Sequence, residues 1–147
     1  MNKYIKLKNR IKRNEGYSNK AYFDQLGNPT IGYGHLIKKS DKLLFKKKYS
    51  KKYLNHLFNK DFNKSLCDFK RHYNKIKLPK GLQEVLIEMI FQLGIKRLLE
   101  FKRFNKFIKQ RLLYLAALEM IDSNWYFQTP KRVDGLINVV LGFDNDK

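Results

Sequence analysis

The chain has 147 residues and a formal net charge of +19, because 32 lysines and arginines outnumber 13 aspartates and glutamates. Its 43% hydrophobic content excludes wholesale disorder, and its length favours one domain. No apolar run reaches the ~20 residues that a membrane-spanning helix needs, and the single cysteine, Cys67, excludes an intramolecular disulfide framework.

The first predicted elements are a helix and a hairpin. Apolar residues recur at helical spacing over 4–11, and the helix should end near Glu15 because Gly16 follows it. Short strands at 21–24 and 30–35 then flank a loop of about five residues that is rich in Gly, Asn and Pro.

The second of these strands carries two glycines on one face. Side chains alternate along a strand, so Thr30, Gly32 and Gly34 should point the same way. A face without side chains lets something bulky approach the backbone.

Helices are predicted for the rest of the chain. Ser50 is a suitable N-cap for a long helix, which the break at 78–81 ends. Residues 82–93 are apolar around most of the helix circumference, which is typical of the centre of a bundle. Further helices are expected around 101–108, 112–121 and 130–140.

These elements predict an α+β, mostly helical, two-lobed fold. A small β-hairpin lobe would cover about 15–60, and a larger helical lobe would combine 1–14 with 61–147. The long helix would join the lobes, and clefts between such lobes commonly bind ligands.

Three side chains near the hairpin indicate chemistry. Glu15 ends a helix, Asp24 lies on the first strand and Thr30 opens the second, so all three could reach one cleft wall. Two carboxylates across a gap are the minimum for glycoside hydrolysis, with one protonated and the other ionised. The spacing also fits an alternative in which Glu15 only ends a helix and Asp24 is only a turn acid.

A larger pattern surrounds these residues. Residues 13–36 contain Arg-Asn-Glu-Gly, then Tyr-Phe-Asp, then Thr-Ile-Gly-Tyr-Gly-His-Leu, with five residues between successive motifs. Glu88-Met-Ile-Phe-Gln-Leu-Gly94 and Ser123-Asn-Trp-Tyr-Phe-Gln-Thr-Pro-Lys-Arg132 follow in order. This series closely resembles the phage-type lysozymes, glycoside hydrolase family 24, which include the T-even phage endolysins. The resemblance covers nearly the whole chain and implies a single lysozyme domain over 1–147, with the lysozyme-like two-lobed fold.

Carried over by position, the resemblance implies the catalytic roles. Glu15 would be the general acid, Asp24 the carboxylate that activates water, and Thr30 the residue that helps to hold that water. The reaction would be hydrolysis, with inversion, of the β-1,4 bond between N-acetylmuramic acid and N-acetylglucosamine in bacterial peptidoglycan. The resemblance implies no metal ion and no organic cofactor.

The resemblance also implies substrate-binding and supporting residues. Six residues match positions that line or support the sugar cleft: Gly34, Leu36, Phe91, Gln92, Gln128 and Thr129. Arg132 resembles the arginine that pairs with the catalytic glutamate, although a solvated charge fits the sequence too. His35 resembles a structural histidine that pairs with an acid on the long helix, and Asp61 matches that acid.

The chain also departs from the family. The stretch from His35 to Asp61 is shorter than in the T-even endolysins, so we expect the third strand and a small helix there to be trimmed. Asn124 and Phe127 replace residues that are usual at the cleft rim. Cys67 is expected to be buried.

The charge has two explanations. Of the 32 basic residues 25 are lysines, which an AT-rich genome favours, and a charge of +19 also attracts polyanions such as nucleic acid, an anionic membrane or the cell wall. No zinc-finger, leucine-zipper or RNP pattern is present, so no specific nucleic-acid partner is expected.

The most direct hypothesis is a monomeric phage endolysin. Without a visible signal peptide it would be made in the host cytoplasm, and a holin or other membrane lesion would release it to the wall. Two other functions stay open: a catalytically inactive module that binds wall, membrane or nucleic acid, and a lytic transglycosylase, which needs the glutamate but no water-activating aspartate.

Overall fold

The computed structural model describes residues 3–144, and its backbone contacts divide the chain into two compact units. Unit 1 comprises residues 1–64 and unit 2 comprises residues 65–147. The predicted α+β, mostly helical class is confirmed. Residues 1–14 fall in unit 1 in the structure, whereas the sequence analysis grouped them with the helical lobe.

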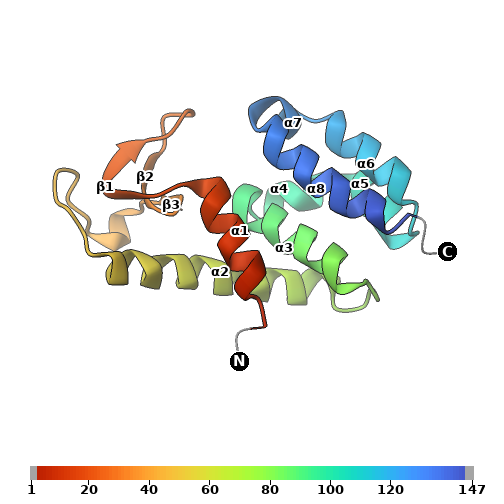
Figure 1. The fold of residues 1–147 in the computed structure, drawn as a ribbon, viewed down its shortest axis with the longest axis horizontal. Coiled ribbons are helices and arrows are strands. Elements are labelled where there is room, and N and C mark those ends of the chain that lie inside the picture. The colour runs from red at the N-terminus through yellow and green to blue at the C-terminus, as the bar shows by residue number, and fades with distance from the viewer. Residues whose placement is uncertain (1–2, 145–147) are drawn as a thin grey trace. The chain divides into compact units, whose positions relative to one another are not determined.

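The elements follow one another as helix, sheet and then helices (Figure 1). Unit 1 contains α1 (Ile5–Glu15), β1 (Ser18–Phe23), β2 (Pro29–Gly32), β3 (His35–Leu36), the 3-10 turn η1 (Lys39–Asp41) and the first part of α2 (Lys51–Tyr73). Unit 2 contains the end of α2, then α3 (Lys80–Leu93), α4 (Ile95–Glu100), α5 (Lys102–Lys109), α6 (Leu113–Ile121), α7 (Asn124–Gln128) and α8 (Pro130–Gly142).

The first helix, α1, ends where the sequence predicted. Gly16 follows Glu15 with φ +73° and donates its N–H to the carbonyl of Lys12. The Lys12 ammonium donates to Asn55 Oδ1 at 2.9 Å and lies 4.9 Å from the ring centroid of Phe58; both partners are on α2. These contacts with α2 give residues 1–14 their place in unit 1.

The sheet is antiparallel in the order β1-β2-β3. The strands β2 and β3 differ from the single strand that the sequence predicted. We predicted one strand over 30–35, with Thr30, Gly32 and Gly34 on one face. Instead β2 ends at Gly32, and β3 begins at His35. Gly32 and Gly34 have φ of +66° and +73°, and this left-handed backbone turns the chain between the two strands.

The region after the hairpin keeps the elements that we expected to be trimmed. The third strand is present as the two-residue β3, and the small helix is present as the three-residue η1. Both elements are short, so they fit within the short stretch between His35 and Asp61.

A small core holds the sheet of unit 1 against the start of α2. Ile31, Leu54 and Leu57 are buried together, and partly buried Ala21, Ile37, Leu43, Tyr49 and Tyr53 pack around them. The predicted N-cap is confirmed, because the Tyr53 N–H donates to Ser50 Oγ at 3.1 Å.

Unit 2 is built around α3, whose residues are mostly buried, as its apolar sequence predicted. The short helices α4 and α7 were not predicted, because segments this short carry too little periodicity. Cys67 is exposed, so its predicted burial is wrong; it lies on the outward face of α2. No helix among residues 3–144 is long and apolar enough to cross a membrane.

Candidate active site

The carboxyl group of Glu15 lies against the backbone of Gly34. Glu15 is partly buried at the end of α1, and Gly34 occupies the turn between β2 and β3. A Cβ atom added to Gly34 would lie 2.9 Å from Cδ of Glu15, closer than real side chains approach. Gly34 therefore leaves the space that the Glu15 carboxyl occupies.

Asp24 closes the turn between β1 and β2. Its Oδ1 accepts hydrogen bonds from the backbone N–H groups of Leu26 at 2.9 Å and Asn28 at 2.8 Å. Its own backbone N–H donates to the carbonyl of Asn28, which closes the loop from the other side. The turn thus fixes the Asp24 carboxylate through Oδ1. This geometry matches the turn-acid alternative, and it equally holds a catalytic carboxylate in place.

Thr30 stands in the centre of the sheet. It is buried, donates its hydroxyl to the carbonyl of Asn28 at 2.9 Å, and pairs with Tyr22 on β1 and with Leu36 on β3. Leu36 itself is exposed. The sheet register therefore sets Thr30 and Leu36, both predicted site residues, side by side.

Tyr22 is a site residue that sequence reasoning missed. It pairs directly with Thr30, and burial raises the pKa of its hydroxyl. The negative charges of Glu15 and Asp24 raise that pKa further, so both carboxylates lie within electrostatic reach of Tyr22. The signal in the sequence was its position two residues before Asp24, on the strand opposite Thr30.

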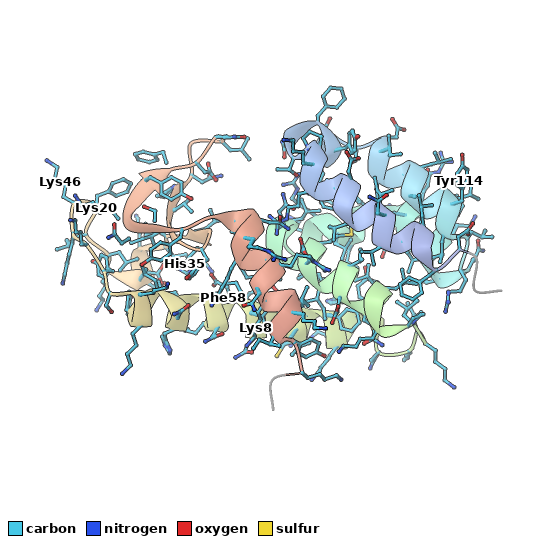
Figure 2. The ribbon with its side chains drawn as sticks, in the orientation of Figure 1. Lys8, Lys20, His35, Lys46, Phe58 and Tyr114 are labelled. Atoms are coloured by element: carbon cyan, nitrogen blue, oxygen red, sulfur yellow. The ribbon has the colours of Figure 1, made fainter. Side chains whose placement is uncertain are left out.

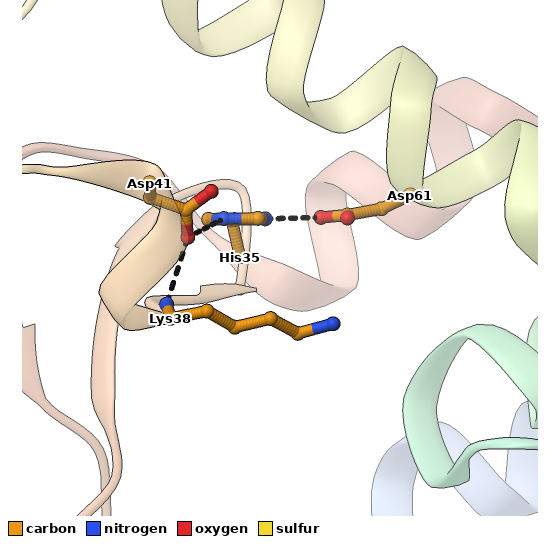
Figure 3. A network of polar contacts seen from close by, with 4 residues as sticks. All are labelled: His35, Lys38, Asp41 and Asp61. Atoms are coloured by element: carbon orange, nitrogen blue, oxygen red, sulfur yellow. Dashed lines mark hydrogen bonds and ion pairs between the residues drawn. The ribbon is translucent and has the colours of Figure 1, made fainter.

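His35 forms the predicted pair with Asp61 and a second pair that the sequence did not indicate. Its Nδ1 lies 2.7 Å from Asp61 Oδ2 on α2, and its Nε2 lies 2.9 Å from Asp41 Oδ2 on η1 (Figure 3). Asp41 also accepts the backbone N–H of Lys38 at 2.7 Å. The histidine thus ties β3 to both η1 and α2.

The two carboxylates favour the protonated form of His35. Burial by itself would lower the pKa of His35, but the hydrogen bonds and charges of Asp61 and Asp41 outweigh burial and raise it. Burial also opposes ionisation of Asp41, yet the Lys38 N–H and the His35 ring lower the pKa of Asp41 overall. Because a neutral imidazole has one N–H, two carboxylate partners fit the protonated ring.

In unit 2, Gln92 and Thr129 are joined. Gln92 lies near the end of α3 and donates from Nε2 to the Thr129 hydroxyl at 3.2 Å. Thr129 is the N-cap residue of α8 and itself donates to the Trp125 carbonyl at 3.4 Å. Phe91 is partly buried beside Gln92, and Gln128 is exposed at the end of α7. The structure therefore brings Gln92 and Thr129 together.

Arg132 and Glu88 form a buried ion pair. Arg132 Nε donates to Glu88 Oε2 at 3.2 Å, and the two side chains are only 8% and 0% exposed. This burial excludes a solvated charge at Arg132. Sequence reasoning missed the role of Glu88, whose signal was a carboxylate within the apolar run 85–91 of α3.

Unit 2 also contains a pocket of about 450 Å³ that includes none of the predicted substrate-binding residues. Charged side chains line much of it, among them Arg97, Glu100, Arg103, Glu119 and Asp122. Within residues 3–144, no group of three or more His, Cys, Asp and Glu side chains is arranged to hold a metal ion.

Known proteins share the pattern of this chain. A family model described as "Phage lysozyme" matches residues 12–139. The chain is 32% identical to "Probable T4-type lysozyme 2" of Dictyostelium discoideum, over 90% of this chain and 92% of the relative. It is 29% identical to "Probable T4-type lysozyme 1" of the same organism, over 91% of this chain and 92% of the relative.

Proposed function

The chain belongs to the phage lysozyme family of glycoside hydrolases, and from this premise we propose that it is a muramidase acting on bacterial peptidoglycan. The bond cut is the β-1,4 link from N-acetylmuramic acid to N-acetylglucosamine, and the anomeric carbon is inverted. Glycoside hydrolase activity follows from membership of the family. The bond that is cut, the stereochemistry and the residue roles are our proposal.

The proposed mechanism uses two carboxyl groups with opposite tasks. Glu15 donates a proton to the leaving glycosidic oxygen, and Asp24 accepts a proton from a water that attacks the opposite face of the sugar. Thr30 helps to hold that water. An inverting enzyme needs roughly 6.5–9.5 Å between its carboxyl groups, so that the water fits.

The observation that carries the proposal is the arrangement around Tyr22. Glu15 and Asp24 belong to different elements, yet the charges of both reach the Tyr22 hydroxyl. Thr30 stands directly opposite Tyr22 in the sheet. Two carboxylates and a threonine around one partly exposed side chain form the set that inverting hydrolysis requires.

Gln92 supports the sugar-binding part of the proposal. Its Nε2 is bonded to Thr129, and its Oε1 is buried without a hydrogen-bond partner among the described residues. A buried acceptor without a donor is costly, and the N–H of an N-acetyl group would supply one. We assign Phe91 and Gln128, its neighbours on α3 and α7, to the same binding surface.

For the biological role, we propose a phage endolysin that is made in the host cytoplasm and reaches the wall after a holin or other lesion permeabilises the membrane. The charge of +19 supports this role, because anionic wall polymers attract a cationic enzyme and raise its encounter rate. Activity should then fall as salt screens the charges.

The test is mass spectrometry of purified peptidoglycan that has been digested with the wild type and with Glu15→Gln. The wild type should release reducing muramic-acid ends, and the variant should release about 10²–10⁴-fold fewer. Glu100→Gln is the matched control, because Glu100 is an exposed glutamate outside the proposed machinery. It removes the same charge and should leave the digest unchanged.

Any other result of this experiment would indicate a different function for the chain. Anhydro-muramic ends would make the chain a lytic transglycosylase and would remove the water-activating role of Asp24. Wall binding without new ends, from wild type and variant alike, would make it a binding module on a lysozyme fold. Reducing N-acetylglucosamine ends would overturn the proposed bond.

A further inference from the structure

Unit 1 exposes a cluster of large apolar side chains away from its core. Phe23, at the end of β1, is 64% exposed; Leu44 is 65% exposed and Phe45 is 42% exposed in the segment between η1 and α2. The rings of Phe23 and Phe45 pack against each other, tilted by 31° with 5.0 Å between their centroids. We call Phe23, Leu44 and Phe45 the apolar cluster.

The chain around the cluster is held in place. Leu43, next to Leu44, turns inward and packs on the core of Ile31, Leu54 and Leu57. The Leu44 N–H donates to the Tyr49 hydroxyl at 2.9 Å. These contacts point Leu43 into unit 1 and leave its two successors outside, so the exposure of the apolar cluster belongs to an ordered segment.

Lysines surround the same segment. Residues 38–52 contain eight lysines and one acid, and every one of these lysines is exposed. The acid, Asp41, is already paired with His35. Lys20 of β1 is exposed too, and Figure 2 shows its side chain at the same end of unit 1 as Lys46. The Tyr49 N–H bonds to the Asn19 carbonyl, which holds this segment beside β1.

We propose that this surface binds an anionic phospholipid bilayer, with the apolar cluster in the interface and the lysines on the headgroups. The lysines suit the charged headgroups of the bilayer, and the apolar cluster suits its interface with the acyl chains. Lysines near an anionic leaflet are attracted to its surface charge, and exposed rings and aliphatic side chains gain by leaving water at the acyl boundary. The inference is independent of the proposed hydrolysis and adds a second binding function to the chain.

A soluble polyanion fits the surface less well. Wall polymers and nucleic-acid backbones would satisfy the lysines but would leave Leu44 in water. The Phe23 and Phe45 rings already pack against each other, which makes them poor platforms for separate bases. An exposed leucine and a ring pair framed by lysines is instead the composition of interfacial membrane segments.

The experiment measures binding of the full chain to phosphatidylglycerol-containing vesicles and to pure phosphatidylcholine vesicles by co-sedimentation. The wild type should bind the first and not the second. The double variant Leu44→Ser/Phe45→Ser, which keeps the net charge, should lose about tenfold or more in affinity. Phe23 is left unchanged because it adjoins Asp24.

Two matched controls accompany this variant. Leu112→Ser/Tyr114→Ser removes an exposed leucine and an exposed aromatic residue from unit 2, which are 42% and 59% exposed, and it should bind vesicles like the wild type. Heparin chromatography reports charge alone, so the Leu44→Ser/Phe45→Ser variant should elute at the wild-type salt concentration. Thermal melts establish that both variants fold.

Insertion itself is measured with Phe45→Trp. Its emission should shift to the blue on phosphatidylglycerol vesicles and be quenched by brominated lipid tails, over a constant background from the buried Trp125. Unchanged vesicle affinity of Leu44→Ser/Phe45→Ser would overturn the proposal, as would an equal loss in the unit 2 control or absence of the shift. If the Leu44→Ser/Phe45→Ser variant also lost affinity for heparin, the surface would bind a soluble polyanion instead.

Discussion

The Glu15 carboxyl and the Gly34 backbone occupy adjoining space, so that the glycine has room for no side chain at all. A Cβ at Gly34 would lie 2.9 Å from Cδ of Glu15. Gly34 also has φ +73°, which turns the chain from β2 into β3. One residue therefore shapes the turn and sets where the proposed general acid can lie.

The first prediction concerns Gly34→Ala. The new methyl group must displace the Glu15 carboxyl, so the rate of peptidoglycan cleavage should fall by up to ~10²-fold. The left-handed backbone should also cost about 1–2 kcal/mol in the free energy of unfolding. Activity is measured as reducing ends released, and stability is measured by urea denaturation.

Gly94→Ala separates these two effects. Gly94 has φ +84°, but a Cβ there meets no atom within 4 Å. This variant should lose similar stability and keep its activity when it is assayed below its melting temperature. Equal activities of Gly94→Ala and Gly34→Ala would show that the contact with Glu15 does not matter.

The second prediction tests whether Glu15 and Asp24 share a site, without relying on catalysis. Burial and both carboxylate charges raise the pKa of Tyr22, so Glu15→Gln and Asp24→Asn should each lower that pKa. It should stay above the ordinary value of 10.0, because burial is the largest cause. An NMR titration of labelled tyrosine rings measures the change.

Tyr53 is the internal reference for this titration. Its pKa is also raised, by burial and then by the charges of Asp41 and Tyr49, so neither substitution should move it. If neither substitution changed the pKa of Tyr22, the carboxylates of Glu15 and Asp24 would not both act on Tyr22. The support for a shared site would then be lost.

The sequence predicted much of this fold because local signals agreed with it. Gly16 ends α1 and Ser50 caps α2, and each rule needs only neighbouring residues. The break between β2 and β3 was missed because Gly32 and Gly34 fit an alternating strand as well as a left-handed turn. Only the backbone dihedral angles distinguish these possibilities.

The sequence predicted the site residues that belong to a continuous motif. It did not predict those whose contacts depend on the tertiary fold. Asp61 was found as the partner of His35 by position, whereas Asp41 was missed because a short 3-10 turn brings it to the ring. Tyr22 depends on sheet register, and Glu88 depends on packing across helices. Such contacts between distant residues leave no local pattern.

The third prediction concerns stability against pH. The pKa of His35 is raised in the folded protein, so its contribution to the free energy of unfolding is complete below its ordinary value of 6.5. That contribution is lost as pH rises through the folded-state pKa. Asp41 has a lowered pKa, so its contribution is present above 3.8 and is lost as pH falls through the lowered pKa. The network should stabilise the protein most between these two limits.

The measurement is the urea unfolding free energy from about pH 5 to about pH 9. His35→Gln should remove the loss of stability that the wild type shows as His35 deprotonates. Its effect should be about 1.5–3 kcal/mol at the acidic end, which is typical of hydrogen bonds to charged groups. His56→Gln alters an exposed histidine on α2 and should keep the wild-type slope. If the two variants had the same slope, the network would not be the source of the pH dependence.

The fourth prediction concerns the buried pair of Glu88 and Arg132. Glu88→Ala removes the fully buried carboxylate that Arg132 Nε contacts, and it should lower the free energy of unfolding by about 3–5 kcal/mol. The double variant Glu88→Met/Arg132→Met should cost less than Glu88→Ala, because it removes both charges and refills the volume with apolar atoms. Urea denaturation of all three proteins measures this. A double variant as unstable as Glu88→Ala would show that lost packing, and not the loss of the Glu88 charge beside Arg132, causes the effect.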